Sequence, residues 1–195
     1  MRVATFWTTV APALAGARGP VFHLSQGYEA AFSFYASQRD RIVAAYGLPA
    51  RKLAISSSLA ARLQAAGHGP VENVGQAFDT SPFFPAPEPR PEAQLPVVVV
   101  VGPCAADVKG IRVAYEGLAL WRKRGGTFRL RRAATEPPTE EERTGDLVDE
   151  YHRAVPPERM PFLYRASDLF IAPSRAEEGF GLPAVEALGL ARRAL

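Results

Sequence analysis

The sequence is poor in the residues that bind metals or form disulfides. It contains one cysteine, Cys104, and three histidines, His23, His68 and His152, among 195 residues. A single cysteine excludes a disulfide framework and any zinc site made of several cysteines. The histidines lack the spacing of metal ligands, so we expect no metal. We also expect no resident cofactor. We interpret His23 as strand filling and Cys104 as a small loop residue rather than a reactive thiol.

Long apolar runs are also absent. The longest is the five valines of 97–101, which is far too short to span a bilayer. The N-terminus lacks a basic start followed by an apolar stretch and a small-residue cleavage site, so we expect no signal peptide and a cytoplasmic protein.

Neither sign of charge dominates the chain. Lys and Arg number 23 and Asp and Glu 20, which gives a net charge of +3. Without a long basic run this excess does not resemble a nucleic-acid footprint, whereas acidic small molecules remain candidate ligands.

Proline is concentrated in one place. Five of the 18 prolines fall within residues 82–91, a density that prevents a helix or a central strand. We therefore predict a domain over residues 1–82, a proline-rich linker over 83–94 and a second domain over 95–195.

Both predicted domains alternate strands with helices. Residues 97–101 are typical of a strand buried on both faces of a parallel sheet. In the second domain we expect strands 97–101, 127–131, 150–155 and 168–172, a helix from 111 that stops at Gly125, and a helix over 157–166. In the first we expect strands 2–7, 20–24, 52–56 and 71–74, a helix over 37–46, and a helix capped by Ser58 and ended by Gly67. Glutamates 140–142 fit a solvated helix start better than a site. The pattern predicts an α/β fold of two doubly wound parallel sheets.

The loop after the last predicted strand is the best candidate for chemistry. It contains the segment 178–186, Glu-Gly-Phe-Gly-Leu-Pro-Ala-Val-Glu. Gly179 and Gly181 permit tight turns, and Pro183 suits the first turn of a helix whose free N–H groups would attract an anion. Glu178 and Glu186 could face one pocket and accept hydrogen bonds from a polyol. Alternatively, Glu178 is a surface loop residue and Glu186 an ordinary helix glutamate.

Segment 178–186 resembles the glutamate-x7-glutamate signature of retaining glycosyltransferases with the GT-B fold, of the family 4 type. Upstream, residues 156–174 are similar to the helix, strand and serine that precede this signature, and residues 101–110 to a loop that carries a diphosphate-binding lysine. Residues 24–29 and 73–79 resemble weaker landmarks of the acceptor-side domain. The resemblance implies that 1–82 is the C-terminal portion of the acceptor-side domain and 95–195 the N-terminal portion of the donor-binding domain.

The resemblance also implies roles for individual residues. Glu186 would bind the ribose hydroxyls of a nucleotide diphosphate sugar and Glu178 the donor sugar. Lys109 would neutralise the departing diphosphate, so that Lys109 and Glu178 are the implied catalytic residues. The backbone of Gly179, Phe180, Gly181 and Leu182 would line the donor site. A solvated lysine at a helix start is the other reading of Lys109.

The sequence departs from the family in two respects. Pro103 stands where many members have an arginine, so one diphosphate cation is missing from that position. The chain is also about half as long as we expect of a complete two-domain enzyme, and Arg192 and Arg193 replace an expected Gly-Pro and valine-rich strand. We therefore hypothesise a truncated chain in which both domains are incomplete.

The leading interpretation is a glycosyltransferase that moves a sugar to a hydroxyl of a glycan or lipid-linked acceptor, as in polysaccharide biosynthesis. A lipid-linked acceptor would imply peripheral contact with the inner face of the membrane. The alternative is a non-catalytic remnant that binds a nucleotide sugar or a partner. A dehydrogenase is disfavoured because no Gly-x-Gly-x-x-Gly follows a strand. The donor base, the sugar and the oligomeric state are not determined by the sequence.

Overall fold

The computed structural model describes residues 1–84 and 95–190, so most of the predicted linker 83–94 lies outside the described residues. The chain divides by its contacts into two units, each of which is described by itself. Unit 1 comprises Met1–Ala77 and Ala176–Phe180, and unit 2 comprises the described residues of Phe78–Arg175 and those from Gly181 onward. A short segment far along the sequence thus belongs to unit 1, which the sequence did not suggest.

Unit 1 is built on one parallel sheet. Its elements in chain order are β1 (Arg2–Ala4), α1 (Trp7–Leu14), β2 (Val21–Ser25), the 3₁₀ turns η1 (Glu29–Ala31) and η2 (Ser33–Gln38), α2 (Arg39–Gly47), β3 (Arg51–Ala54), α3 (Ser57–Ala65) and β4 (Val71–Asn73). The strands are ordered β1-β2-β3-β4, and each neighbouring pair is parallel. The expected alternation of strands and helices is confirmed.

Two local predictions in unit 1 were wrong. The strand predicted over 2–7 ends at Ala4, because α1 begins at Trp7. The Thr9 hydroxyl accepts a hydrogen bond from the Phe6 N–H at 3.3 Å and donates to the Phe6 carbonyl at 2.7 Å, which fixes the start of α1. Helix α3 is capped by Ser56, not Ser58, since the Ser56 hydroxyl accepts from the Leu59 N–H at 3.2 Å.

His23 lies in the core of unit 1. It is on the buried face of β2 and is 1% exposed, with its ring 4.5 Å from that of the buried Tyr46. Burial lowers the pKa of His23 to about 4, and the nearby charge of Lys52 acts in the same direction. The interpretation of His23 as strand filling is therefore confirmed.

Unit 2 is a doubly wound sheet. Its elements are β5 (Val97–Val101), η3 (Asp107–Lys109), α4 (Ile111–Lys123), β6 (Arg129–Ala134), α5 (Glu140–Thr144), β7 (Glu150–Arg153), η4 (Pro157–Arg159), α6 (Met160–Arg165), β8 (Leu169–Ile171) and α7 (Leu182–Gly189). The parallel strands are ordered β7-β6-β5-β8. The chain therefore runs outward from β5 to β7 and then returns to the other side of β5, so the strand order reverses between β5 and β8.

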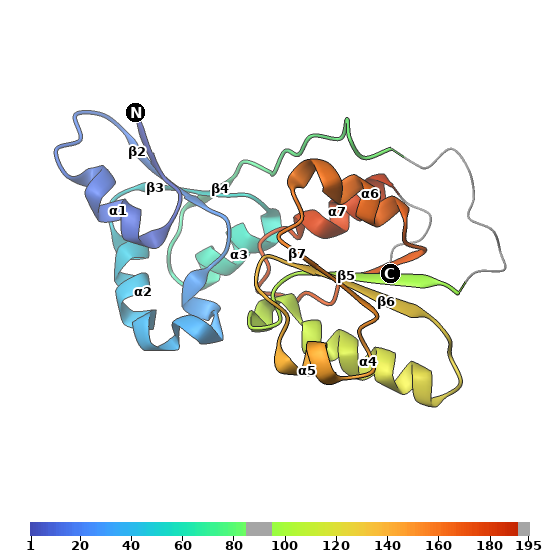
Figure 1. The fold of residues 1–195 in the computed structure, drawn as a ribbon. Coiled ribbons are helices and arrows are strands. Elements are labelled where there is room, and N and C mark those ends of the chain that lie inside the picture. Colours follow the sequence, from blue (N-terminus) through green and yellow to red (C-terminus); the bar gives the residue numbers. More distant parts are fainter. Residues whose placement is uncertain (85–94, 191–195) are drawn as a thin grey trace. The chain divides into compact units, whose positions relative to one another are not determined.

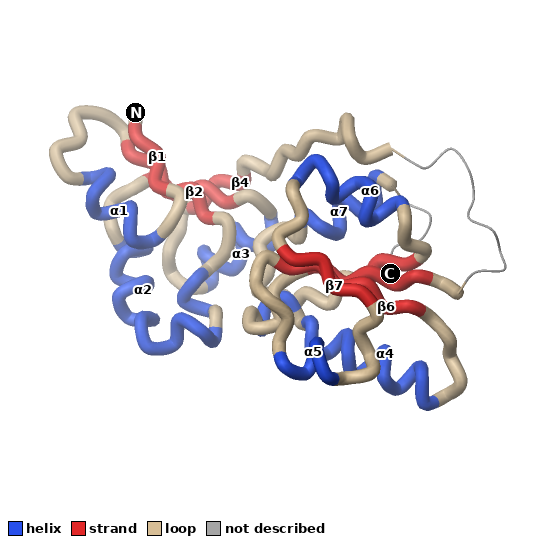
Figure 2. The backbone as a smooth tube through the Cα atoms, viewed as in Figure 1, coloured by secondary structure: helices blue, strands red, loops and turns tan. Residues whose placement is uncertain are grey.

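Helices cover both faces of the unit 2 sheet, with α4 and α5 on one face and α6 and α7 on the other (Figures 1 and 2). The valines of β5 alternate between these layers. Val98 and Val100 pack in the cluster that contains residues of α4, whereas Val99 packs with residues of α6 and α7. All three are at most 1% exposed, as predicted for a strand buried on both faces.

Three boundaries in unit 2 differ from the predictions. Strand β6 covers Arg129–Ala134 rather than 127–131, and β7 ends at Arg153. The helix predicted over 157–166 is the 3₁₀ turn η4 followed by α6. Glutamates 140–142 do begin a helix, but Glu142 is buried rather than solvated.

Candidate functional site

The loops that carry the predicted site residues follow β5 and β8. Strand order reverses between these two strands, and open α/β sheets bind ligands at the carboxyl ends of the strands at such a point. The loop after β5 carries Lys109, and the chain after β8 leads to α7 and Glu186. Unit 2 thus has both segments at the position where its topology favours a ligand.

The loop after β5 is shaped around two glycines. Gly102 has φ +131°, and a Cβ placed on it would lie 3.4–3.5 Å from carbons of the Lys109 side chain. The aliphatic part of Lys109 therefore packs directly over Gly102. Gly110 adopts the left-handed conformation at the start of α4, immediately after Lys109. Lys109 is held at the end of η3, at the junction of the loop and the helix.

The loop after β5 is fastened to the chain that leaves β8. A Cβ on Gly110 would lie 1.9 Å from the Pro173 carbonyl oxygen, so only glycine fits there without a backbone shift. The Arg175 N–H also donates to the Val108 carbonyl at 2.8 Å. These contacts bring Arg175, a residue that the sequence reasoning did not single out, beside the Lys109 loop. Arg175 and Arg112 line a cavity of about 270 Å³ there.

Helix α7 begins as the sequence predicted. Gly181, with φ +77°, is the N-cap residue of α7, and Leu182 and Pro183 follow it in the first turn. Proline has no N–H to lose in a first turn, and the left-handed glycine turns the chain into the helix. The start of α7 can therefore present backbone N–H groups to an anion.

Glu186 is held in place by a buried tyrosine. The Tyr164 hydroxyl of α6 donates to Glu186 Oε2 at 2.8 Å. Burial raises the pKa of Tyr164, and the negative charge of Glu186 raises it further, so this hydroxyl remains a donor. The contact fixes the orientation of the Glu186 carboxylate, which a hydrogen bond to a sugar hydroxyl requires.

The segment with Glu178, Gly179 and Phe180 packs in unit 1. The Ser56 hydroxyl donates to the Gly179 carbonyl at 2.6 Å, and Arg62 donates to the Ala176 carbonyl at 3.1 Å. A Cβ on Gly179 would lie 1.9 Å from the Gln26 carbonyl oxygen. Phe180 packs against the unit 1 core. Glu178 and Glu186 therefore belong to different units, and their convergence on one pocket stays a prediction.

The sequence reasoning missed a buried ion pair in unit 2. Arg132 Nε lies 3.0 Å from Glu142 Oε1, and these side chains are 0% and 1% exposed. Tyr115 donates to Glu142 and accepts from Arg132 Nε at 2.5 Å. Burial alone would raise the pKa of Glu142, but hydrogen bonds from Tyr115 and Thr139 and the charge of Arg132 hold it below its ordinary value. The available signal was Thr139-x-x-Glu142, a capping box that places Glu142 back against its helix start.

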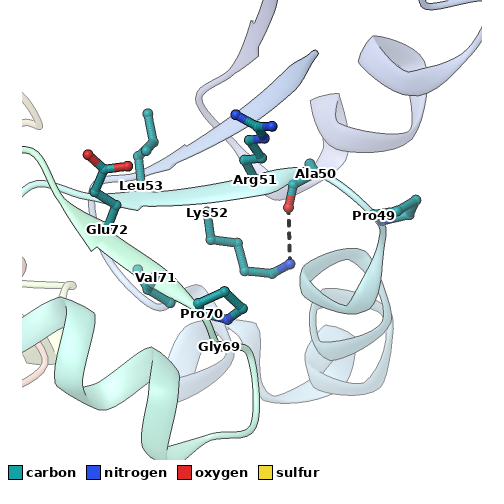
Figure 3. Close-up of a pocket in the computed structure, with 9 residues that line it drawn as sticks. All are labelled: Pro49, Ala50, Arg51, Lys52, Leu53, Gly69, Pro70, Val71 and Glu72. Carbon is teal, nitrogen blue, oxygen red and sulfur yellow. Dashed lines mark hydrogen bonds between the residues drawn. The ribbon is translucent and has the colours of Figure 1, made fainter. Parts of the chain in front are cut away.

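Unit 1 also has a cavity, of about 450 Å³, at the amino ends of β3 and β4 (Figure 3). Lys52 Nζ extends below the strands and donates to the Ala50 carbonyl at 3.2 Å. Ligands of open α/β sheets bind at the opposite, carboxyl ends, so this cavity is a weaker candidate than the unit 2 loops.

Residues 1–84 and 95–190, which the structure describes, give no support for a metal site, a membrane-spanning helix or a reactive cysteine. This part of the chain holds no group of three or more His, Cys, Asp or Glu side chains that could ligate a metal. Nor does any helix within it have the length and apolarity to cross a bilayer. Cys104 is half-buried, and burial raises the pKa of its thiol, which disfavours the reactive thiolate.

Comparisons with known proteins agree with the fold. A sucrose-phosphate synthase from Thermosynechococcus elongatus matches with TM-score 0.73 and 18% identity over 98% of this chain and 54% of that one. Anabaena HepE, solved with UDP, matches with TM-score 0.66 and 18% identity over 98% and 58%. The catalytic domain of Arabidopsis thaliana starch synthase IV, bound to ADP and acarbose, matches with TM-score 0.61 and 16% identity over 95% and 54%. This chain thus spans about half the length of the solved structures that it matches, and its two parallel sheets have the GT-B fold.

Sequence comparison identifies the family. The comparison with curated protein sequences finds no match. The family model described as "Glycosyl transferases group 1" matches residues 95–193, about half of the chain. The matched region contains the Lys109 loop, β8 and α7. The chain therefore belongs to the group 1 glycosyl transferases.

Proposed function

We propose that this chain binds a nucleotide diphosphate sugar and takes part in transferring the sugar, with retention of configuration, to a hydroxyl of a glycan or lipid-linked acceptor. The observation that carries the proposal is the junction of the Lys109 loop with the chain leaving β8, at the reversal of strand order in unit 2. UDP and ADP accompany two of the similar structures, which favours a nucleoside diphosphate as the ligand.

The residues of unit 2 suit this ligand chemically. The Lys109 ammonium and the N–H groups at the start of α7 would stabilise the negative charge that develops on the departing diphosphate. Glu186, oriented by Tyr164, would accept hydrogen bonds from the two ribose hydroxyls. From unit 1, Glu178 and the Gly179–Phe180 backbone would contact the donor sugar in this proposal. In this proposal no metal neutralises the diphosphate.

The proposal needs no enzyme nucleophile. A phosphate oxygen of the donor would take the proton of the acceptor hydroxyl as the bond from the sugar to the diphosphate breaks. The new bond then forms on the face that the diphosphate leaves, which retains the configuration. Catalysis would then depend on positive charge beside the diphosphate, which Lys109 of unit 2 would supply.

The length of the match supports a second candidate. The chain spans about half the length of the structures that it resembles. In the second candidate function it binds the nucleotide sugar or a partner but does not transfer sugar. Turnover separates the two candidates, since a binding protein would take up the donor and release no nucleoside diphosphate.

Thermal unfolding with nucleotides tests the shared part of both candidates. We would compare the Tm of the full chain with uridine, guanosine and adenosine diphosphates and their sugars. A ligand at 100 times its Kd stabilises by about 2.7 kcal/mol, which is a Tm increase of about 5–10 °C at this size. We expect one base to produce this shift, and Glu186→Ala to abolish it, while Glu116→Ala on the exposed side of α4 preserves it. A cooperative transition that no nucleotide moves would contradict the donor site.

A further inference from the structure

Arg132 on β6 is an unusual residue for the interior of a sheet domain. It is 0% exposed, and its partner Glu142 comes from a different element, α5. Removing two opposite charges from water is costly, and a buried pair is tolerated only where further hydrogen bonds satisfy its donors and acceptors. The contacts of Arg132 therefore indicate what the pair is for.

The guanidinium contacts the end of β5 and the start of the loop that follows. Its Nη1 donates to the Val100 carbonyl at 2.7 Å, and its Nη2 donates to the Gly102 carbonyl at 2.8 Å. The Gly102 N–H donates in turn to the Ala133 carbonyl at 2.9 Å. Gly102 is thus held on both sides. Arg132 binds its carbonyl, and the carbonyl of Ala133, the next residue of β6, binds its N–H.

Gly102 is also the residue over which Lys109 packs. Carbons of the Lys109 side chain lie 3.4–3.5 Å from the position of a Cβ on Gly102, so a displacement of this glycine would displace the lysine. A chain of contacts consequently runs from Glu142 through Arg132 and Gly102 to Lys109. Each link is a hydrogen bond or a close packing contact within unit 2.

We propose that Arg132, oriented by Glu142, is a positioning residue that fixes the loop of residues 102–109 so that Lys109 meets the diphosphate of the donor. The inference rests on the proposed function. An apolar side chain would fill the same space but could not hold the two carbonyls. Lysine would keep the charge but lacks the planar fork that reaches both oxygens at once.

The network offers a matched control. The Tyr115 hydroxyl bonds to Arg132 Nε and to Glu142 but not to the loop. Tyr115→Phe therefore disturbs the same buried network and spares both carbonyl contacts. Arg132→Lys removes at least one of those contacts. If Arg132→Lys does not fold, Arg132→Met combined with Glu142→Met replaces the whole pair by apolar groups, a change that is often neutral for stability.

Two measurements separate positioning from stability alone. The first is hydrogen exchange of the 102–109 amides without nucleotide, which should accelerate in Arg132→Lys, or in the double Met variant, and not in Tyr115→Phe. The second is the Kd for the nucleoside diphosphate that stabilises the wild-type chain, which should rise about tenfold in Arg132→Lys and less than twofold in Tyr115→Phe. In a Lys109→Gln background, Arg132→Lys should have little further effect on this Kd.

Specific results would overturn the inference. Equal loop exchange in Arg132→Lys and Tyr115→Phe would show that Arg132 supports only the core. An undiminished effect of Arg132→Lys in the Lys109→Gln background would show that it does not act through Lys109. If the wild-type chain bound no nucleoside diphosphate, the proposed function would fail, and the exchange comparison would still decide whether Arg132 holds the loop.

Discussion

Replacing Gly110 by alanine should destabilise unit 2 far more than a loop substitution ordinarily does. Two costs combine at this position. Gly110 has φ +63°, a conformation that costs an L-residue about 1–2 kcal/mol. The new Cβ would also lie 1.9 Å from the Pro173 carbonyl oxygen, and relieving such overlap by backbone movement costs about 1–3 kcal/mol. We expect Gly110→Ala to lower the free energy of unfolding by about 2–5 kcal/mol.

Gly125 provides the control for the first of these costs. It has φ +86°, follows the same helix α4, and has no heavy atom within 4 Å of where its Cβ would be. Gly125→Ala should therefore lose only about 1–2 kcal/mol. The difference between the variants isolates the close approach of the loop after β5 to the chain after β8.

Urea unfolding of both variants at 25 °C, followed by circular dichroism, measures this difference. The midpoint should fall further in Gly110→Ala at an unchanged m-value. Nucleoside diphosphate affinity should fall in Gly110→Ala and not in Gly125→Ala, because only the former moves Lys109. Equal losses of stability in the two variants would refute the close approach and, with it, the fastening of these two loops.

Three further predictions concern charge and packing. Lys109→Gln should weaken binding of a nucleoside diphosphate and leave the much weaker affinity for the nucleoside unchanged, as titration calorimetry would show. Folding lowers the pKa of His23 from 6.5 to about 4, so as the pH falls the unfolded chain takes up a proton at this histidine before the folded chain does. The stability of the folded chain is therefore full above pH 6.5, and about 3 kcal/mol of it is lost as the pH falls towards 4. His23→Leu should remove this part of the pH dependence in urea titrations. Gly179→Ala should destabilise unit 1, because the new Cβ meets the Gln26 carbonyl oxygen at 1.9 Å, whereas Gly117→Ala, in open space within α4, should stabilise by about 0.5–1 kcal/mol.

Each of these predictions has a contrary result. Equal losses for nucleoside and nucleoside diphosphate would remove Lys109 from the diphosphate. A His23→Leu chain with the same acid dependence as the wild-type chain would assign that dependence to other groups. Unaltered stability in Gly179→Ala would show that the 176–180 segment does not pack in unit 1.

The sequence predicted the features that depend on local pattern. The five valines of β5 predicted a strand buried on both faces, and Gly181 followed by Leu182 and Pro183 predicted the start of α7. Both signals lie within a few residues of the structure they specify. Helix α1 was not predicted because its local pattern is misleading. Thr8, Thr9 and Pro12 disfavour a helix, but the core of unit 1 nevertheless stabilises one.

Features that depend on long-range contacts were beyond sequence patterns. Arg132 fits an alternating strand and Glu142 an acidic helix start, and neither pattern shows that the two meet across 10 residues in the core. The close approach of Gly110 to Pro173 likewise follows from the pairing of β5 with β8, which the order of residues alone does not specify. The sequence therefore indicated which loops carry the candidate site, but not the contacts that hold these loops in place.

The packing of residues 176–180 in unit 1 has a consequence for how the protein is made. The hydrogen bonds from Ser56 and Arg62 to this segment join residues 123 and 114 positions apart, whereas the sheet β1-β2-β3-β4 pairs successive strands. On the ribosome, that sheet can assemble while most of unit 2 is still unsynthesised. Segment 176–180, which completes unit 1, is synthesised only after about 100 more residues have been added. Contacts between residues so far apart in the sequence form slowly. Of the two units, unit 1 is therefore synthesised earlier but completed only after most of unit 2 has been made.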